Sequence, residues 1–592
     1  MKSTRSKALG ALLIAGALAL GACSNGAGDG NGNGSTGSGD DSGGESEVTL
    51  TEAGFALRTP AASPGGTVTV LGAVDFSHLD PTMGNDGNVN NFYHLIYRHL
   101  TNYVYDPETE EMTLVGDLAE DLGTSNEDAT VWTFTLREGL RYEDGTPITS
   151  HDLKYALERS MDPGLAIGSD LHMVIDGARE YAGIYDAPEG LDSISTPDDR
   201  TIEFTLERPL ADFNAVAANP PFTPFPDGEV DVEQIDVQPI ASGPYRVESY
   251  ERGSHVSLVR NEEWDPETDP IRAAQPDAFE FVFGLDPNTI DQRALTGQGD
   301  DRNAVISSTN PLLPASLGRV LDDETLRERT IQILPTCTTF LTLNTTKDVM
   351  SDLTVRQALN YAIDRQSVIT ATGGPAVAEV ATEMLLPTVP GREEFDLYPT
   401  DNSEGDPELA RSMIEEAGYD VDELSFVMDV RGIPKWQAQA EAVQQSLQAA
   451  GISVELNVID GATYYEAIGT PAQQNDMAIY GWCGSWLSGT PLLTPLFDGT
   501  RISESGNTNM SQFDEPEIND RFREIEMITD IDEQNAAYAE LNREIMEHAP
   551  VVPLVRETPL QMVGENVGDA YAHAARTGYI DYASVGLIDP EG

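Results

Sequence analysis

The sequence predicts an α/β protein with more than one hydrophobic core. Apolar residues alternate in several short segments, as Trp132, Phe134 and Leu136 do, and this period of two is typical of strands with one buried face. Segments with helical spacing lie between these strands, and such alternation favours α/β packing. About 540 residues follow the N-terminal leader and linker, more than the ~250–300 at which a single core stops growing. We therefore expect at least two lobes.

Local signals mark the individual elements. Alternation predicts strands at residues 66–71, 132–136, 202–206 and 452–458. Asp144 and Gly145 form a turn signal, and the spacing of Thr149 and Asp152 is that of a capping box at the start of a helix.

Further helices are predicted at residues 353–365, 407–417 and 436–450. Asp406 and Pro407 are of the types preferred at the N-cap and the first helical position, and Gly418 and Gly451 are stop signals. We find no tandem repeat.

The N-terminus has the pattern of a secretory leader. Cations precede an apolar stretch at residues 8–20, which is shorter than the ~20 residues of a membrane-spanning helix. Residues 20–23 (LGAC) resemble a bacterial lipobox, whose cysteine becomes the lipid-modified first residue. We therefore expect a lipoprotein signal peptide at residues 1–22 and lipidation of Cys23; the alternative is an ordinary leader with a chance cysteine.

Residues 23–64 are expected to be a flexible tether, because their first half consists largely of Gly, Ser, Asn and Asp. Residues 32–37 within it fit the dinucleotide-binding pattern G-x-G-x-x-G. No predicted strand precedes this pattern and no helix follows it, so it indicates linker and not a nucleotide site.

The composition is strongly acidic. The formal net charge is -66, with 100 acidic and 34 basic residues. A charge of this sign repels nucleic acid and anionic lipid, which excludes both as binding partners. An acidic surface keeps a protein soluble, and a sharper hypothesis is a salt-tolerant host, because such a surface suits charge screening at high ionic strength.

If Cys23 carries lipid, Cys337 and Cys483 remain as a pair in an oxidising compartment, where a disulfide is the default and two buried thiols are the alternative. The sequence contains no C-x-x-C pattern and no Cys/His cluster, which argues against structural zinc.

Catalytic motifs are missing from the sequence. Neither G-x-S-x-G nor H-E-x-x-H occurs, and the eight histidines are scattered. His94 and His99 are five residues apart, so they do not share a helical face as i,i+4 ligands would. We expect no catalytic residues, no metal site and no cofactor, and a secreted hydrolase is the less favoured alternative.

Residues 131–160 (VWTFTLREGLRYEDGTPITSHDLKYALERS) resemble the signature of the peptide/nickel class, family 5, of ABC transporter solute-binding proteins. That signature runs aromatic-x-F-x-L-R, then D-G-x-P-x-T, then a helix that ends in E-R. Other segments that resemble the family are residues 79–81 (LDP), 241–247 (ASGPYRV), 258–261 (LVRN) and 353–365 (LTVRQALNYAIDR). The resemblance extends from residue 65 to the C-terminus.

The resemblance implies a two-lobed α/β fold of the periplasmic-binding-protein-like class II, with an extra insertion subdomain and a ligand cleft between the lobes. Lobe I would comprise residues 65–108, 240–335 and 557–592, the insertion subdomain residues 109–239, and lobe II residues 336–556. The chain would cross between the lobes near Pro335 and Arg556, and closure about such crossings is a hinge motion.

The resemblance also implies the function of a monomeric, lipid-anchored binding component at the extracellular face of the cell membrane. It would capture an extended solute, in the first place an oligopeptide, and deliver it to the permease subunits of an ABC importer. A metal chelate or an oligosaccharide is the alternative within the same class. For a metal, His78 would lie beside the cleft.

In peptide-binding relatives the ligand lies as an added strand along the G-W-C segment and the loop after L-D-P. The matching positions are Gly481, Trp482, Cys483, Gly84, Asn85, Asp86 and Gly87. Relatives also bridge the corresponding cysteines, which implies a disulfide between Cys337 and Cys483. Trp482 and Trp486 would line ligand pockets or belong to the core.

Ser485 stands where many relatives carry an aspartate that pairs with the α-amino group of the peptide. A hydroxyl offers no compensating charge, so this anchor would be weaker by about tenfold. Either another acid such as Asp86 replaces it, or the ligand lacks a free amine. We favour the second, which keeps modified peptides and oligosaccharides open.

Overall fold

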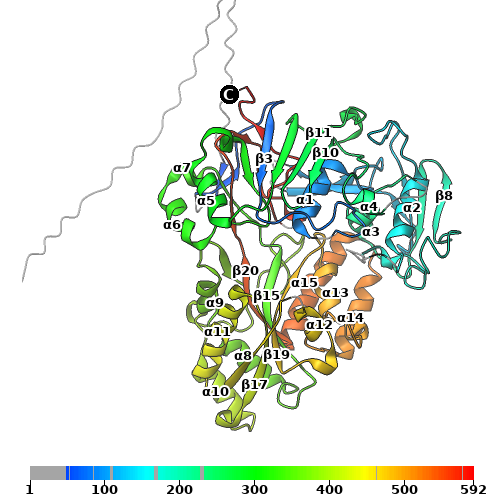
Figure 1. The fold of residues 1–592 in the computed structure, drawn as a ribbon. Helices are drawn as coiled ribbons and strands as arrows, with labels where there is room; N and C mark the ends of the chain where they lie inside the picture. Colours follow the sequence, from blue (N-terminus) through cyan, green and yellow to red (C-terminus); the bar gives the residue numbers. More distant parts are fainter. Residues whose placement is uncertain are drawn as a thin grey trace, which may run out of the picture. The chain divides into compact units, whose positions relative to one another are not determined.

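Two large mixed sheets form the centres of the two lobes (Figure 1). The computed structural model describes residues 49–51, 54–84, 86–106, 111–163, 165, 171–226, 232–461, 463–576 and 578–591. The first sheet has the order β10-β11-β12-β3-β13, with β3 at Thr67–Leu71, β10 at Tyr245–Glu251, β11 at His255–Arg260, β12 at Ala278–Val282 and β13 at Ala304–Ile306. β3 pairs in parallel with both β12 and β13. Val68 and Val70 of β3, which has a neighbour on each side, are fully buried, as residues of parallel strands usually are.

The second sheet has the order β16-β20-β15-β19-β17-β18. Its strands are β15 (Cys337–Leu343), β16 (Ala378–Val380), β17 (Ser425–Arg431), β18 (Ser453–Ile459), β19 (Met477–Cys483) and β20 (Val551–Glu557). The parallel neighbours β17 and β18 are connected by helix α11 (Pro434–Ala449). A βαβ crossover of this kind covers one face of the sheet with its helix.

The remaining helices surround the two sheets. Those of the first lobe include α1 (Gly87–Ile96), α5 (Pro287–Thr296), α6 (Pro314–Asp322) and α7 (Glu324–Arg327). Those of the second are α8 (Leu353–Ala362), α9 (Arg365–Thr372), α10 (Pro407–Glu416), α12 (Tyr464–Ile468), α13 (Thr490–Phe497), α14 (Pro516–Glu526) and α15 (Ile531–Glu547). Figure 1 shows α9, α10 and α11 on one side of β15 and β19, and α13, α14 and α15 on the other. No helix in the described ranges is both long and apolar enough to cross a bilayer.

A third sheet, of order β6-β7-β9-β8, forms the insertion subdomain together with α2 (Ser150–Ser160), α3 (Phe213–Val216) and α4 (Val232–Ile235). Its strands are β6 (Thr124–Ser125), β7 (Val131–Thr135), β8 (Ile194–Asp198) and β9 (Thr201–Thr205). The hairpin of β4 (Thr101–Asp106) and β5 (Glu111–Gly116) precedes it. Trp132, Phe134, Phe204 and Phe213 are buried together in its core, with rings in edge, tilted and stacked contacts.

The local signals in the sequence are confirmed at most elements. The four predicted strands are β3, β7, β9 and β18, with ends shifted by a residue or two. Asp152 accepts a hydrogen bond from the backbone N–H of Thr149 at 2.7 Å, which is the capping box expected at the start of α2. Asp406 caps α10 by accepting from the N–H of Leu409.

The expected tether reaches too far into the fold. Residues up to 64 were assigned to it, yet β1 (Thr49–Leu50) and β2 (Ala56–Arg58) belong to a sheet with β14 (Thr330–Gln332) and β21 (Leu560–Met562). Phe55 and Ala56 are buried. The correction has a simple physical cause, since three strand residues are too few to show a period-two pattern, and their partner strands lie far away in the sequence. The signal peptide and Cys23 lie outside the described residues.

A buried ion pair joins the insertion subdomain to the first lobe. Asp80 follows β3, and Arg159 lies in the last turn of α2; both side chains have 0% exposure. Arg159 donates from Nη1 to Oδ1 of Asp80 at 3.0 Å and from Nη2 to Oδ2 at 2.6 Å. The same Nη1 also donates to the hydroxyl of Thr82 at 2.8 Å. Because neither side chain contacts water, the charge of each is compensated only by its partner. The pair therefore holds α2 against the segment that follows β3.

We expect Arg159→Met to destabilise the protein by about 3–5 kcal/mol, because it leaves the Asp80 carboxylate buried and unpaired. Urea unfolding followed by circular dichroism measures the loss. The double variant Asp80→Asn/Arg159→Met leaves no buried charge and should recover part of that free energy. Equal losses in the single and double variants would contradict a paired-charge role.

Candidate ligand-binding site

A cavity of 1060 Å³ lies where the two lobes and the insertion subdomain meet. Gly87, Asn90 and Asn91 of α1 line it from the first lobe. Residues 482–486, at and after the end of β19, line it from the second lobe, and residues 216 and 218–220 line it from the insertion subdomain. Its volume lies at the upper end of the ~300–1,000 Å³ of small-molecule sites, so it has room for an extended solute.

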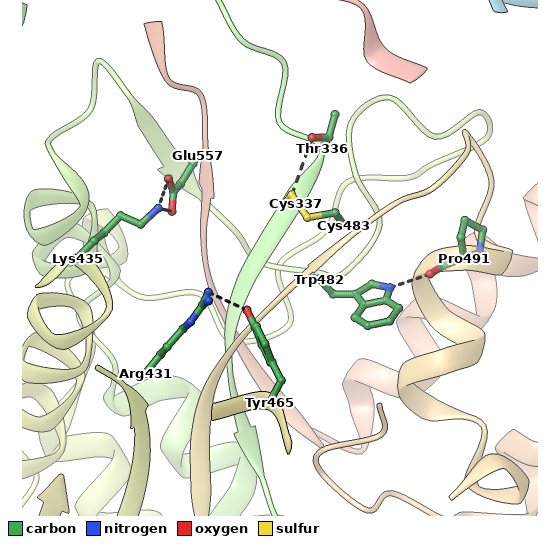
Figure 2. The surroundings of a disulfide bond; sticks show 9 residues. All are labelled: Thr336, Cys337, Arg431, Lys435, Tyr465, Trp482, Cys483, Pro491 and Glu557. Carbon is green, nitrogen blue, oxygen red and sulfur yellow. Dashed lines mark hydrogen bonds and ion pairs between the residues drawn. A yellow bond between two sulfur atoms is a disulfide. The ribbon is translucent and has the colours of Figure 1, made fainter. Parts of the chain in front are cut away.

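The disulfide between Cys337 and Cys483 lies in the cavity wall and confirms the expected pairing (Figure 2). It joins the start of β15 to the end of β19, and the two cysteines face each other in the antiparallel register. Its partners are separated by 146 positions in the sequence. The bridge therefore fixes the end of β19 against β15 at the edge of the cavity.

The same register decides where the backbone groups of β19 point. Gly484 donates its N–H to the carbonyl of Thr336 at 3.1 Å, which makes this pair a hydrogen-bonded one. Because hydrogen-bonded and non-hydrogen-bonded pairs alternate in antiparallel sheets, Cys483 and Gly481 belong to non-hydrogen-bonded pairs. The Cα atoms of Cys337 and Cys483 are 4.0 Å apart, which agrees with the short separation in non-hydrogen-bonded pairs. The N–H and C=O groups of Gly481 and Cys483 thus face away from β15.

On the side away from β15, the last residues of β19 have no neighbouring strand among the described residues. β17 pairs with β19 only at Met477 and Ala478. Within the described residues no strand pairs with residues 480–483 on the side away from β15. An unpaired strand edge next to a cavity is a template for a further strand.

The structure brings together most of the predicted residues of the second lobe. Trp482, Cys483, Ser485 and Trp486 line the cavity, and Gly481 immediately precedes this wall. Trp482 is half-buried, and its Nε1 donates to the carbonyl of Pro491 at 2.8 Å (Figure 2). Its ring is thereby held in the wall.

Fewer of the predicted residues of the first lobe lie in the cavity wall. Gly87 lines the cavity, whereas Gly84 is buried against Tyr93, where a Cβ would overlap the tyrosine hydroxyl. Asp86 caps α1 by accepting the N–H of Asn88 at 3.0 Å, and it is not part of the wall. In this structure Asp86 therefore serves as the helix cap, outside the wall that contains Ser485. Asn85 lies outside the described residues.

Trp486 lines the cavity and is also buried, with 8% exposure. It is therefore both a wall residue and a core residue, which the sequence analysis gave as alternatives. Its ring belongs to the core of the insertion subdomain. Its Nε1 donates to Oδ2 of Asp212 in that subdomain at 2.6 Å. Burial raises the pKa of Asp212, although the hydrogen bond from Trp486 opposes this effect. This contact links the second lobe to the insertion subdomain across one end of the cavity.

The charged side chains of the wall are ones that the sequence patterns did not single out. They are Arg179, Glu207, Arg208, Arg501 and Arg576. Arg208 pairs with Glu526 at 3.0 Å, and Nε of Arg501 lies 3.7 Å from Asp498. Arg576 donates to Asn102, and burial lowers its pKa to about 10.

A metal site receives no support from the geometry. His78 contacts Asp236 at 3.2 Å and is not in the cavity wall. Among the residues that the structure describes, no group of three or more His, Cys, Asp or Glu side chains is placed to hold a metal ion.

A cavity between two α/β lobes is a place where proteins commonly bind small solutes. The model of the bacterial extracellular solute-binding proteins, family 5 Middle, matches residues 113–504. The chain belongs to this family of solute-binding proteins. It is a binding component of ABC importers that works outside the cytoplasmic membrane, and it is not an enzyme.

Several relatives are similar over most of their length. The probable D,D-dipeptide-binding periplasmic protein DdpA of Escherichia coli (strain K12) is 23% identical, over 84% of this chain and 90% of its own. The glutathione-binding protein GsiB of Salmonella typhi is 22% identical, over 86% and 92%. The solved structure of clavulanic acid biosynthesis oligopeptide binding protein 2 is 32% identical, with a TM-score of 0.84 over 92% of this chain and 99% of that one. DppA from Helicobacter pylori in complex with the peptide STSA has a TM-score of 0.65 at 20% identity, over 89% and 99%, and shows the fold alone.

We expect Asp212→Asn to change the pH dependence of stability. Because burial raises the pKa of Asp212, the folded chain holds this proton at pH values where the unfolded chain has lost it, so stability falls as pH rises through that window. Asparagine keeps an acceptor for Trp486 but has no proton to lose. The variant should therefore gain stability relative to the parent from about pH 4 upward, by about 1.4 kcal/mol per unit of raised pKa.

Urea unfolding at a series of pH values measures this difference. The exposed Asp322→Asn, which removes a carboxyl outside this contact, is the matched control. A constant difference between Asp212→Asn and the parent across the series would contradict a protonation effect at this contact.

Proposed function

We propose that the chain captures an oligopeptide as an added strand on β19 and delivers it to the permease of an ABC importer. The observation that carries the proposal is the free edge of residues 480–483, where Gly481 and Cys483 direct backbone N–H and C=O groups away from β15. Main-chain hydrogen bonds at such an edge accept many peptide sequences, because they do not involve the ligand's side chains. Relatives named for dipeptide and oligopeptide binding support this class of solute.

The wall gives the peptide further contacts. Trp482 and Trp486 offer aromatic surface on one side, and Gly87 and Asn91 of α1 lie on the other. The binding residues that we propose are Gly84, Asn85, Asp86, Gly87, Gly481, Trp482, Cys483, Ser485 and Trp486, with those in the wall contributing most. Ser485 supplies no charge for a free amine, which favours a modified or N-blocked peptide over one with a free N-terminus.

We also propose the lobe boundaries at residues 65–108, 240–335 and 557–592 for lobe I, 109–239 for the insertion subdomain and 336–556 for lobe II. The chain passes from β14, in the sheet of order β1-β2-β14-β21, to β15 of the second sheet. It returns from β20 of the second sheet to β21. These two connections, near Pro335 and Arg556, are where a hinge would absorb backbone rotation.

Native mass spectrometry of the protein purified from its own host identifies the bound solute. We then expect a series of that peptide, each with one backbone amide N-methylated, to lose affinity at every second position. Each lost hydrogen bond should cost about 0.5–1.5 kcal/mol, because alternate amides of an added strand face β19. Calorimetry gives the affinities, and losses without a period of two, or an oligosaccharide or metal chelate as the bound species, would overturn the added-strand peptide.

Lipid attachment at Cys23 completes the proposal, because residues 20–23 have the lipobox pattern after a secretory leader. A lipid anchor would hold the protein beside its permease. We expect Cys23→Ser to release the protein into the medium, since it removes the attachment site; immunoblots of membrane and medium fractions measure this. A variant that stays with the membrane fraction would contradict lipidation.

A further inference from the structure

We propose that the solute is anionic, and that Arg179, Arg208 and Arg501 form a subsite for the carboxylates of acidic side chains. The inference rests on the proposed peptide-binding function and names the class of peptide. It follows from the charge of the cavity wall, from the placement of these three side chains and from the absence of an acid at position 485.

The charge of the wall is opposite to that of the protein. The whole chain has 100 acidic and 34 basic residues, so acidic residues outnumber basic ones about three to one. Among the described residues of the wall, Arg179, Arg208, Arg501 and Arg576 stand against Glu207 alone. A wall drawn from this composition by chance would be mostly acidic, so the excess of guanidinium groups calls for a ligand-related cause.

The three arginines come together from separate segments. Arg179 and Arg208 lie in the insertion subdomain, and Arg501 ends a short 3-10 helix (Gly499–Arg501) of the second lobe. Burial lowers the pKa of Arg501, and the positive charges of Arg208 and Arg179 lower it further, which requires that both lie near its guanidinium. The subsite therefore spans the cavity between the subdomain and the lobe.

Neighbouring carboxylates compensate the cluster only in part. Arg208 pairs with Glu526, while Asp498 lies 3.7 Å from Nε of Arg501. Arg179 is exposed and forms no ion pair among the described residues. Burial raises the pKa of Glu526, which means that the loss of water destabilises its charged form. Asp498 and Glu526 raise the pKa of Arg501, but desolvation, which is the largest cause, and the two neighbouring arginines outweigh them.

The chemistry of the guanidinium group identifies the ligand group. Its planar fork matches a carboxylate in a bidentate arrangement, and such charge-assisted pairs are stronger than hydrogen bonds between neutral groups. Ser485 fits the same solute, because a wall with few acids has no partner for a ligand ammonium but does not repel a ligand carboxylate. Glutamate or aspartate side chains on the bound peptide would meet Arg208, which is half-buried, and the exposed Arg179 and Arg501.

Calorimetry with two matched peptides tests the inference, both N-acetylated and C-amidated so that only side chains differ. We expect Ac-Ala-Glu-Glu-Ala-NH2 to bind the full chain at least tenfold more tightly than Ac-Ala-Gln-Gln-Ala-NH2. A third peptide with glutamines and a free C-terminal carboxylate separates terminal from side-chain recognition. If it regains the whole tenfold, the arginines bind the terminus and the proposal of an acidic-side-chain subsite is overturned.

Variants locate the effect. Arg501→Gln and Arg179→Gln should each reduce the affinity ratio of the two peptides at least fivefold. Arg302→Gln removes an exposed arginine that pairs with Glu565 outside the cavity, and should leave the ratio unchanged. Equal affinities for the glutamate and glutamine peptides would overturn the anionic subsite while peptide binding stands. Binding of neither peptide, together with a non-peptide solute in native mass spectrometry, would overturn the peptide function itself.

Discussion

The antiparallel pairing of β15 with β19 is the constraint on which the proposed site depends. Backbone groups alternate in direction along a strand, so a slip of one residue would turn the N–H and C=O groups of Gly481 and Cys483 toward β15. The free edge beside the cavity would then present different groups. The disulfide joins Cys337 to Cys483 across the same register, and therefore excludes the slip while it is intact. Its structural value lies in this geometry as much as in its effect on the unfolded chain.

Beyond Cys483, the wall is held by a contact of a different kind. The disulfide lies within the second lobe, whereas Trp486 reaches into the core of the insertion subdomain and bonds to Asp212. A hinge motion that separates lobe II from the subdomain leaves the first contact intact and breaks the second. Burial of the Asp212 carboxyl limits how much this contact stabilises the folded chain, because the charged form of the carboxyl is shielded from water there.

Sequence patterns predicted those features that depend only on residues close together in the sequence. The capping box of Thr149 and Asp152 and the N-cap at Asp406 need only a few neighbouring residues, and both are present. The family resemblance led to the disulfide and to the wall residues after β19. Strand β2 was missed because its partners are distant in the sequence. The arginines of the wall were missed for the same reason: Arg179, Arg208 and Arg501 come from three segments, and no spacing within any one of them marks a site.

The acidity of the chain and the cations of its cavity act at different distances. Surface charge repels an anionic solute during its approach, but at physiological ionic strength this field decays over a Debye length of about 8 Å. The arginines act at contact, where the two charges are closest and their attraction is strongest. Repulsion therefore lowers mainly the association rate, and contact with the guanidinium groups lowers mainly the dissociation rate. In a salt-rich medium the first effect weakens more than the second, because screening by mobile ions acts most strongly on charges that are far apart. A net charge of -66 is thus compatible with an acidic solute, and it is the local sign of the wall that decides which solute is retained.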